Sequence, residues 1–244
     1  MNFHEGEIIS INKPYGMTSF GALAFVRTRL SRVLHVKRLK TGHAGTLDPL
    51  ATGVLILCTG KATKRIESLQ LATKEYTATL QLGATTPSYD MEHEVDKTYP
   101  TDHITRPMIE SVLTRFVGEI QQTPPQFSAC SVDGDRAYKL ARRGEKVELK
   151  PKTLRIDEIE LTAFDPATML MSIRVVCGKG TYIRALARDI GEALNSGAYL
   201  TALCRTRVGD YRIEDSLTLE QLPDWLQQIT IEDLKTPKSP QGQA

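Results

Sequence analysis

The sequence predicts an α+β fold with a mixed, largely antiparallel β-sheet core flanked by helices. Segments with strand-like patterns outnumber those with helical patterns, and the two kinds do not alternate regularly as they would in a parallel α/β sheet. The chain has 244 residues, of which 41% are hydrophobic and 25% charged, so it can bury a sizeable core. We expect one domain over residues 1–234, with a Pro- and charge-rich insertion over about residues 121–152 and a disordered tail over residues 235–244.

The N-terminal elements begin with a short strand over residues 7–12, which ends at Lys13-Pro14. A helix follows, because Thr18 or Ser19 can cap its start and the next apolar side chains recur at helical spacing. Residues 35–49 are basic and interrupted by glycines, which favours a loop with local turns. Residues 53–58 form a compact apolar run, typical of a buried strand or the start of a helix. The apolar stripe of the helix consists of Leu23, Val26, Leu30 and Val33.

The remaining elements are predicted from the alternation of apolar and polar residues and from residues that start or end an element. Residues 75–82 alternate strictly between apolar and polar side chains, which indicates a half-buried strand, and polar residues 87–102 favour a loop. Thr105 can cap a helix that runs to Phe116 before Gly118. Further along the chain we expect a hairpin over residues 154–164 and 169–177, a helix over 182–194, a strand over 199–213 and a short helix over 219–226.

Positive charge is concentrated near the N-terminus, although the net charge is only +2. Between Ile8 and Leu47 every charged side chain is basic, and Lys61, Lys64 and Arg65 follow. Such a block is expected for contacts with nucleic-acid phosphates, while the alternative is a solvated helix face. The candidate phosphate contacts in this region are Lys13, Arg38, Lys40 and Lys61.

Several classes of protein are excluded by what the sequence lacks. The four cysteines lie far apart without a C-x-x-C pair, so we expect reduced thiols and no metal site. No apolar run approaches the roughly 20 residues that span a bilayer. The polar N-terminus has no signal-peptide pattern, which makes the cytoplasm the expected location.

The segment over residues 42–55 carries the strongest indication of chemistry. Gly42, Gly45 and Gly53 shape a tight loop around Asp48, which stands directly before Pro49 and is therefore held out of the helical region. An isolated Asp-Pro is most often a turn. A carboxylate beside a buried apolar run can instead be a positioned nucleophile or base.

This segment resembles the Gly-His-x-Gly-Thr-Leu-Asp-Pro-x-Ala-x-Gly-x-Leu motif of the TruB family of tRNA pseudouridine synthases. The resemblance extends from about Ile9 to about Leu222, and four further motifs occur in the family's order. Five matches in sequence are highly specific. The four further motifs are Ile11-Asn12-Lys13-Pro14-x-Gly16-x-Thr18-Ser19, Lys74-Glu75-Tyr76 with Ala78, Gly180-Thr181-Tyr182-Ile183-Arg184-x-Leu186-x-x-Asp189-x-Gly191, and Leu203-x-Arg205-Thr206-x-x-Gly209. In addition, the family's insertion that holds RNA is matched by Pro124-Pro125-x-Phe127-Ser128-Ala129 and Arg136-Ala137-Tyr138.

The resemblance implies a pseudouridine synthase fold and the isomerisation of uridine 55 in the T loop of tRNA, without a cofactor. Asp48 would supply an ionised carboxylate, either as a nucleophile or as a base acting on the ribose. Arg184 would pair with that carboxylate and keep it ionised, although a helix-surface arginine is the alternative.

The resemblance also implies a pocket for the target base. Tyr76 would stack on the base and help to move the C5 proton, whereas alternation by itself places Tyr76 in the core. His43 would lie beside the flipped nucleotide, and Tyr182 and Leu203 would line the uracil pocket. The alternatives are an incidental loop histidine for His43 and a core leucine for Leu203.

The RNA-binding surface implied by the resemblance includes Arg136, Arg142 and Arg205, which with the basic N-terminal third would hold the T-stem loop while the base is extruded. Positive charges common in the family are absent at Ser131, Asp135 and Cys204, which puts RNA affinity in question. We expect the family's C-terminal PUA domain to be missing. We expect no membrane or protein partner and a monomer.

Two other functions fit parts of the pattern. One is an RNA-binding module that has lost activity. The other is a hydrolase that cleaves a glycosidic bond, but such enzymes usually need two cooperating carboxylates, and only Asp48 stands in a suitable motif.

Overall fold

The computed structural model describes residues 1–128, 130–132, 135–137, 140, 143 and 148–232. The chain divides into two compact units, residues 1–70 with 211–244 and residues 71–210. Each unit contains a β-sheet with helices, so the predicted α+β class is confirmed. Within the described part of the chain, no helix is long and apolar enough to cross a membrane.

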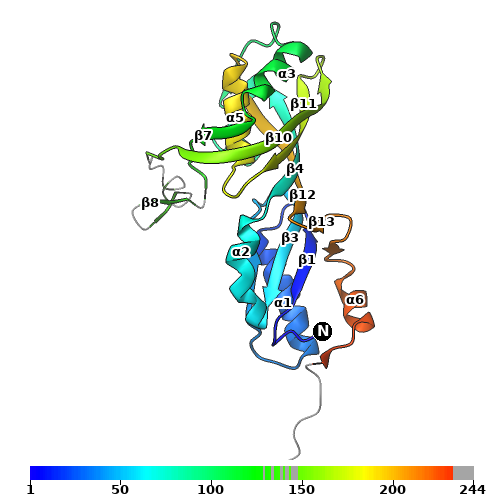
Figure 1. The fold of residues 1–244 in the computed structure, drawn as a ribbon. Coiled ribbons are helices and arrows are strands. Elements are labelled where there is room, and N and C mark those ends of the chain that lie inside the picture. The colour runs from blue at the N-terminus through cyan, green and yellow to red at the C-terminus, as the bar shows by residue number, and fades with distance from the viewer. Residues whose placement is uncertain (129, 133–134, 138–139, 141–142, 144–147, 233–244) are drawn as a thin grey trace, which may run out of the picture. The chain divides into compact units, whose positions relative to one another are not determined.

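The first unit is built on a small mixed sheet (Figure 1). Strand β1 (Ile8–Lys13) pairs antiparallel with β3 (Thr52–Thr59) and parallel with β14 (Leu217–Thr218). Strand β2 (Thr41–Ala44) pairs antiparallel with β3. The run over residues 53–58 is therefore a strand, and every side chain in it is buried.

Helix α1 (Ser19–Val33) supplies the apolar layer over this sheet. Thr18 caps it, because its side chain accepts a hydrogen bond from the Gly21 N–H. The predicted stripe packs inward, with Leu23, Val26 and Leu30 buried against the Ile9 and Ile11 face of β1. The C-terminal helix α6 (Leu222–Gln228) adds Leu222 and Leu226 to the same core.

The second unit contains an antiparallel sheet in the order β12-β4-β11-β10-β7. Strand β4 (Lys74–Leu82) alternates as predicted, and the hairpin of β10 (Lys152–Asp165) and β11 (Leu170–Cys177) is confirmed. Strand β12 (Ala198–Val208) pairs with β4 on one side, and β7 (Gly118–Gln122) pairs with the first residues of β10 on the other. Helix α5 (Ile183–Ala193) packs on β12 and α3 (Arg106–Thr114) packs on β10. The short strands of this unit are β5 (Ala84–Thr85), β6 (Lys97–Thr98), β8 (Ser131–Val132) and β9 (Asp135–Arg136).

Some predicted boundaries were wrong, and two short helices were not predicted. The expected loop over residues 35–49 contains β2, because residues 41–44 bond to the edge of β3. The single strand expected over residues 199–213 ends at Val208, since Gly209 turns the chain with φ +54° before the short β13 (Tyr211–Arg212). The 3-10 helix η1 (Gly60–Arg65) and helix α2 (Ile66–Leu71) were not predicted.

Gly191 permits the close approach of α5 to the chain that enters β12. A Cβ at this position would lie 2.4 Å from the Ala198 nitrogen and 2.6 Å from the Gly197 carbonyl carbon. These are backbone atoms at the start of β12, where the Gly197 carbonyl accepts a hydrogen bond from the Gly83 N–H, so they cannot move independently.

We therefore expect Gly191→Ala to lower the free energy of unfolding by about 1–3 kcal/mol, because overpacking outweighs the gain in helix propensity. Urea unfolding measures the change. Gly178→Ala is the matched control, because its nearest contact, the Arg155 carbonyl oxygen, lies at 3.7 Å. Equal stability of the Gly191→Ala variant and the wild type would contradict the prediction.

Candidate active site

The loop that carries Asp48 is anchored by a buried lysine. Lys13 ends β1 on the same face as Ile9 and Ile11, and its side chain is 0% exposed. Its Nζ donates to the carbonyls of Pro14 at 2.9 Å, Met17 at 2.6 Å and Pro49 at 3.2 Å. Burying an ammonium group is costly unless its donors are satisfied, and three carbonyl oxygens match the three donors.

This arrangement corrects the predicted role of Lys13 as a phosphate contact. The ammonium group is enclosed by protein carbonyls, so it is not presented to a ligand. Lys13 instead connects the turn after β1 to the residue that follows Asp48. The Gly16 N–H reinforces this connection by donating to the Pro49 carbonyl at 2.9 Å.

A second clamp holds the residue before Asp48. The Ser19 Oγ donates to the Leu47 carbonyl at 2.9 Å and accepts from the Leu47 N–H at 2.8 Å, and both residues are buried. The main chain is therefore fixed on both sides of Asp48, whose own side chain is half-buried. The Ala51 N–H closes the turn by donating to the Asp48 carbonyl at 3.1 Å.

Two predicted features of the loop lie in the same unit. Gly45 and Gly53 adopt φ values of +91° and +102°, which side chains rarely allow. His43 lies on β2 opposite Leu57 and is half-buried. The strand orients His43, although its segment was expected to be a loop.

In the second unit, Tyr76 and Leu203 lie on neighbouring strands. Tyr76 on β4 faces Arg205 on β12 in register, and Leu203 faces Ala78. Tyr76 is buried, whereas Leu203 is only half-buried and so is not a fully enclosed core leucine. Arg205 is 2% exposed, which corrects its expected role as a surface phosphate contact.

Arg184 is a buried cation held by groups far away in the sequence. Its Nη1 donates to the Ser88 carbonyl at 3.1 Å, its Nη2 donates to the Phe127 carbonyl at 2.9 Å, and its Nε lies 3.6 Å from Asp90 Oδ2. Arg184 is 4% exposed and Asp90 is 6% exposed, so the guanidinium is positioned rigidly and is not a helix-surface arginine. The pairing of Arg184 with Asp48 implied by the resemblance joins residues of different units and stays a proposal.

Tyr182 stands at the start of α5, where Gln122 fixes its backbone. The Gln122 Nε2 donates to the Tyr182 carbonyl at 3.2 Å, and the Tyr182 N–H donates to Gln122 Oε1 at 2.9 Å. Gln122 is fully buried. Sequence reasoning missed both Asp90 and Gln122, because each acts on a partner more than 50 residues away and stands in a segment without its own pattern.

A second lysine, Lys74, lies at the start of β4 near Tyr76. It is buried, and its Nζ donates to the Ala72 carbonyl at 2.6 Å. Burial, together with the positive charge of Arg205, lowers the pKa of Lys74 to about 8. The base of β4 is therefore a positively charged region with little access to solvent.

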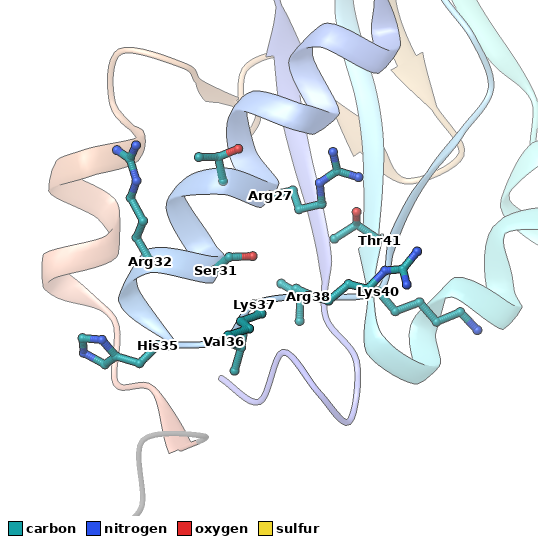
Figure 2. Close-up of a pocket in the computed structure, with 11 residues that line it drawn as sticks. Arg27, Ser31, Arg32, His35, Val36, Lys37, Arg38, Lys40 and Thr41 are labelled. Carbon is teal, nitrogen blue, oxygen red and sulfur yellow. The ribbon is translucent and has the colours of Figure 1, made fainter.

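The remaining candidates for phosphate contact differ in position. Arg38 and Lys40 are exposed and line a pocket of about 1130 Å³ beside α1 (Figure 2). Lys61 is exposed and lies 2.6 Å from Glu5. Arg142 and the side chain of Arg136 lie outside the described residues. Among the described residues, no group of three or more His, Cys, Asp or Glu side chains could hold a metal ion.

Comparisons with known proteins cover nearly the whole chain. A family model described as "TruB family pseudouridylate synthase (N terminal domain)" matches residues 31–183, and one described as "tRNA pseudouridylate synthase B C-terminal domain" matches residues 184–236. A protein of Phocaeicola vulgatus named tRNA pseudouridine synthase B is 64% identical over 234 residues, which are 96% of this chain and 99% of that protein. A protein of the same name from Flavobacterium johnsoniae is 48% identical over 91% of this chain and 97% of its own length.

A solved structure titled "Crystal Structure of a Cbf5-Nop10-Gar1 Complex" has a similar fold, with a TM-score of 0.68 and 30% sequence identity. The similarity covers 92% of this chain and 55% of that one, so the present chain spans about half of its length. The family models and the relatives lead to the same assignment, and the chain belongs to the TruB family of pseudouridylate synthases.

Proposed function

We propose that this protein isomerises uridine to pseudouridine at position 55 in the T loop of tRNA. The observation that carries the proposal is the 64% identity, over 96% of the chain, to a protein named tRNA pseudouridine synthase B. The two family models together match parts of both units, which supports a single catalytic domain formed by residues 1–234.

The reaction needs no second substrate. The bond between uracil N1 and ribose C1′ breaks, the base turns, and a new bond forms between C5 and C1′. N1 gains a proton and C5 loses one, so atoms and electrons balance within the nucleotide. No cofactor is required, and the protein has to supply an ionised carboxylate, a pocket for the base and control of the proton.

Asp48 is the carboxylate in this proposal. Its role is supported by the hydrogen bonds that fix the residues on both sides of it, because catalysis requires a group held in the productive geometry. Tyr76 and Leu203 contact the base, Tyr182 lines its pocket, and His43 lies beside the extruded nucleotide. Arg184 supplies the positive charge that keeps Asp48 ionised.

The substrate in this proposal is the T-stem loop of tRNA, bound by Arg38, Lys40 and Lys61 and by the segment between β7 and β10. The protein works in the cytoplasm as a monomer, without a protein partner. Light scattering of the purified protein, alone and with tRNA, tests the monomer.

The Asp48→Asn variant should still bind tRNA but form pseudouridine at least roughly 10³-fold more slowly, because it keeps the shape of the side chain and loses the charge. Carbodiimide treatment followed by primer extension maps pseudouridine in an unmodified transcript. Asp102→Asn makes the same chemical change at an exposed position and should remain active. Pseudouridine formed by the Asp48→Asn variant would refute the role of Asp48, and released uracil would indicate a hydrolase.

Arg184→Lys should lower the single-turnover rate by roughly 10²-fold or more. Lysine keeps the charge but lacks the two separate nitrogens with which Arg184 donates to the Ser88 and Phe127 carbonyls, so the cation would be misplaced. Arg188→Lys, one turn further along α5, is the matched control. Equal rate losses in both variants would show that Arg184 acts only by holding α5 to the segments that it contacts.

Lys13→Met should lower the free energy of unfolding by about 1–3 kcal/mol, because three carbonyls lose their donor. It should reduce the reaction rate less than Asp48→Asn, since Lys13 positions the loop and does no chemistry. Lys61→Met removes an exposed ion pair and should change stability by less than about 0.5 kcal/mol. Chemical denaturation of the two variants distinguishes these expectations.

A further inference from the structure

Two exposed aromatic side chains lie next to the loop that carries Asp48. Phe20 is 64% exposed and Tyr15 is 61% exposed, and in the described part of the chain they are the only aromatic members of the set of exposed large hydrophobic residues. Phe20 follows Ser19, whose Oγ holds Leu47, and Tyr15 precedes Gly16, whose N–H holds Pro49. The main chain next to both residues is therefore tied to the segments that flank Asp48, while the two rings are exposed.

The exposed face of α1 continues from Phe20 to a cation. Arg27 comes seven residues after Phe20, which places it about 20° around the helix and roughly 10 Å along it. Its guanidinium carbon lies 5.9 Å from the centroid of the Phe20 ring. Ser31 lies about one turn further on the same face, and both Arg27 and Ser31 line the pocket at the end of α1.

This pocket is lined by many basic side chains and no acidic one. In Figure 2, Arg27, Arg38 and Lys40 lie on one side of α1, and Arg32 and His35 lie on the other. Within the described residues, none of the arginines or lysines of the pocket forms an ion pair with a carboxylate. The basic side chains of the lining are Arg27, Arg32, His35, Lys37, Arg38 and Lys40.

Helix electrostatics explain only part of this charge. A cation in the last turn of a helix stabilises the macrodipole, and Arg32 has that position in α1. Lys37, Arg38 and Lys40 come after the helix has ended, where the dipole effect falls off within a turn. Their mutual repulsion is unfavourable in the protein alone, and a polyanion would relieve it.

We propose that the RNA-contact surface formed by Arg38 and Lys40 extends along the face of α1 from this pocket to Phe20, outside the site of the reacting base. Phe20 stacks on an unpaired base, and Arg27 with the other pocket cations binds the adjoining backbone phosphates. Aromatic platforms beside a positive groove are the combination that binds single-stranded nucleic acid. The proposal rests on the proposed function, because the ligand is the tRNA that carries the target uridine.

A matched pair of charge reversals tests the surface. Arg27→Glu should raise the Kd for full-length tRNA at least about fivefold and reduce the salt dependence of binding by about one counterion. Arg29→Glu is the control, because Arg29 lies about 200° around α1 from Arg27 and stacks on Phe25 at 3.2 Å. The control should bind tRNA like the wild type.

Phe20→Ala tests the stacking. Loss of one stacked base corresponds to at least about a fivefold rise in Kd, whereas Val117→Ala, at another exposed apolar position, should cause no change. At saturating tRNA the single-turnover rate of Phe20→Ala and Arg27→Glu should match that of the wild type, since neither residue contacts the reacting base. Circular dichroism melting confirms that each variant is folded.

A comparison of full-length tRNA with an isolated T-stem loop shows which part of the tRNA supplies the phosphates bound by this surface. If the variants weaken binding of both RNAs, the contact is to the T arm, and if they weaken only full-length tRNA, it is to the rest of the molecule. Unchanged tRNA binding by both Phe20→Ala and Arg27→Glu, with an active wild type, overturns the proposal and leaves this face to a protein partner. A wild type that does not modify tRNA would instead refute the proposed function itself.

Discussion

The buried ammonium group of Lys13 is the interaction on which the Asp48 loop depends. A charge at 0% exposure is tolerated only because carbonyls from the turn after β1 and from Pro49 surround it. Those carbonyls lack regular secondary-structure partners, so the lysine and the loop stabilise each other. The Ser19 clamp on Leu47 then leaves the Asp48 main chain little freedom. The Asp48 loop is thus attached to the start of α1 and to the end of β1.

In the second unit, too, buried polar side chains are held by hydrogen bonds to main-chain atoms. Arg184 and Gln122 are both buried, and each is satisfied by main-chain atoms of a distant segment. Such contacts hold the buried side chains in one conformation, because a buried polar group that loses its partner is strongly penalised. Arg184, Arg205 and Lys74 are buried in the protein without RNA. Their burial removes charged groups from water, and for Lys74 this desolvation lowers the pKa.

Positive charge in this protein is divided between two tasks. Lys13 and Arg205 were expected on an RNA-facing surface, yet both are buried and organise the protein. The exposed cations Arg38 and Lys40, together with Arg27 on α1, remain available to phosphates. A net charge of +2 is therefore compatible with RNA binding, because several of the exposed basic side chains line one pocket.

The sequence by itself determined the α+β class, the α1 and α5 helices, the strand over residues 75–82 and the β10–β11 hairpin, because alternation and helical spacing are local properties of the chain. It also singled out the Asp48 loop, since closely spaced glycines and an Asp-Pro pair carry their own conformational meaning. Only the tertiary structure decided that residues 41–44 form a strand, that Lys13 faces inward, and that Asp90 and Gln122 hold Arg184 and Tyr182. Those outcomes depend on partners that lie far away in the sequence, and a local pattern contains no information about which distant group will satisfy a buried charge or a free strand edge.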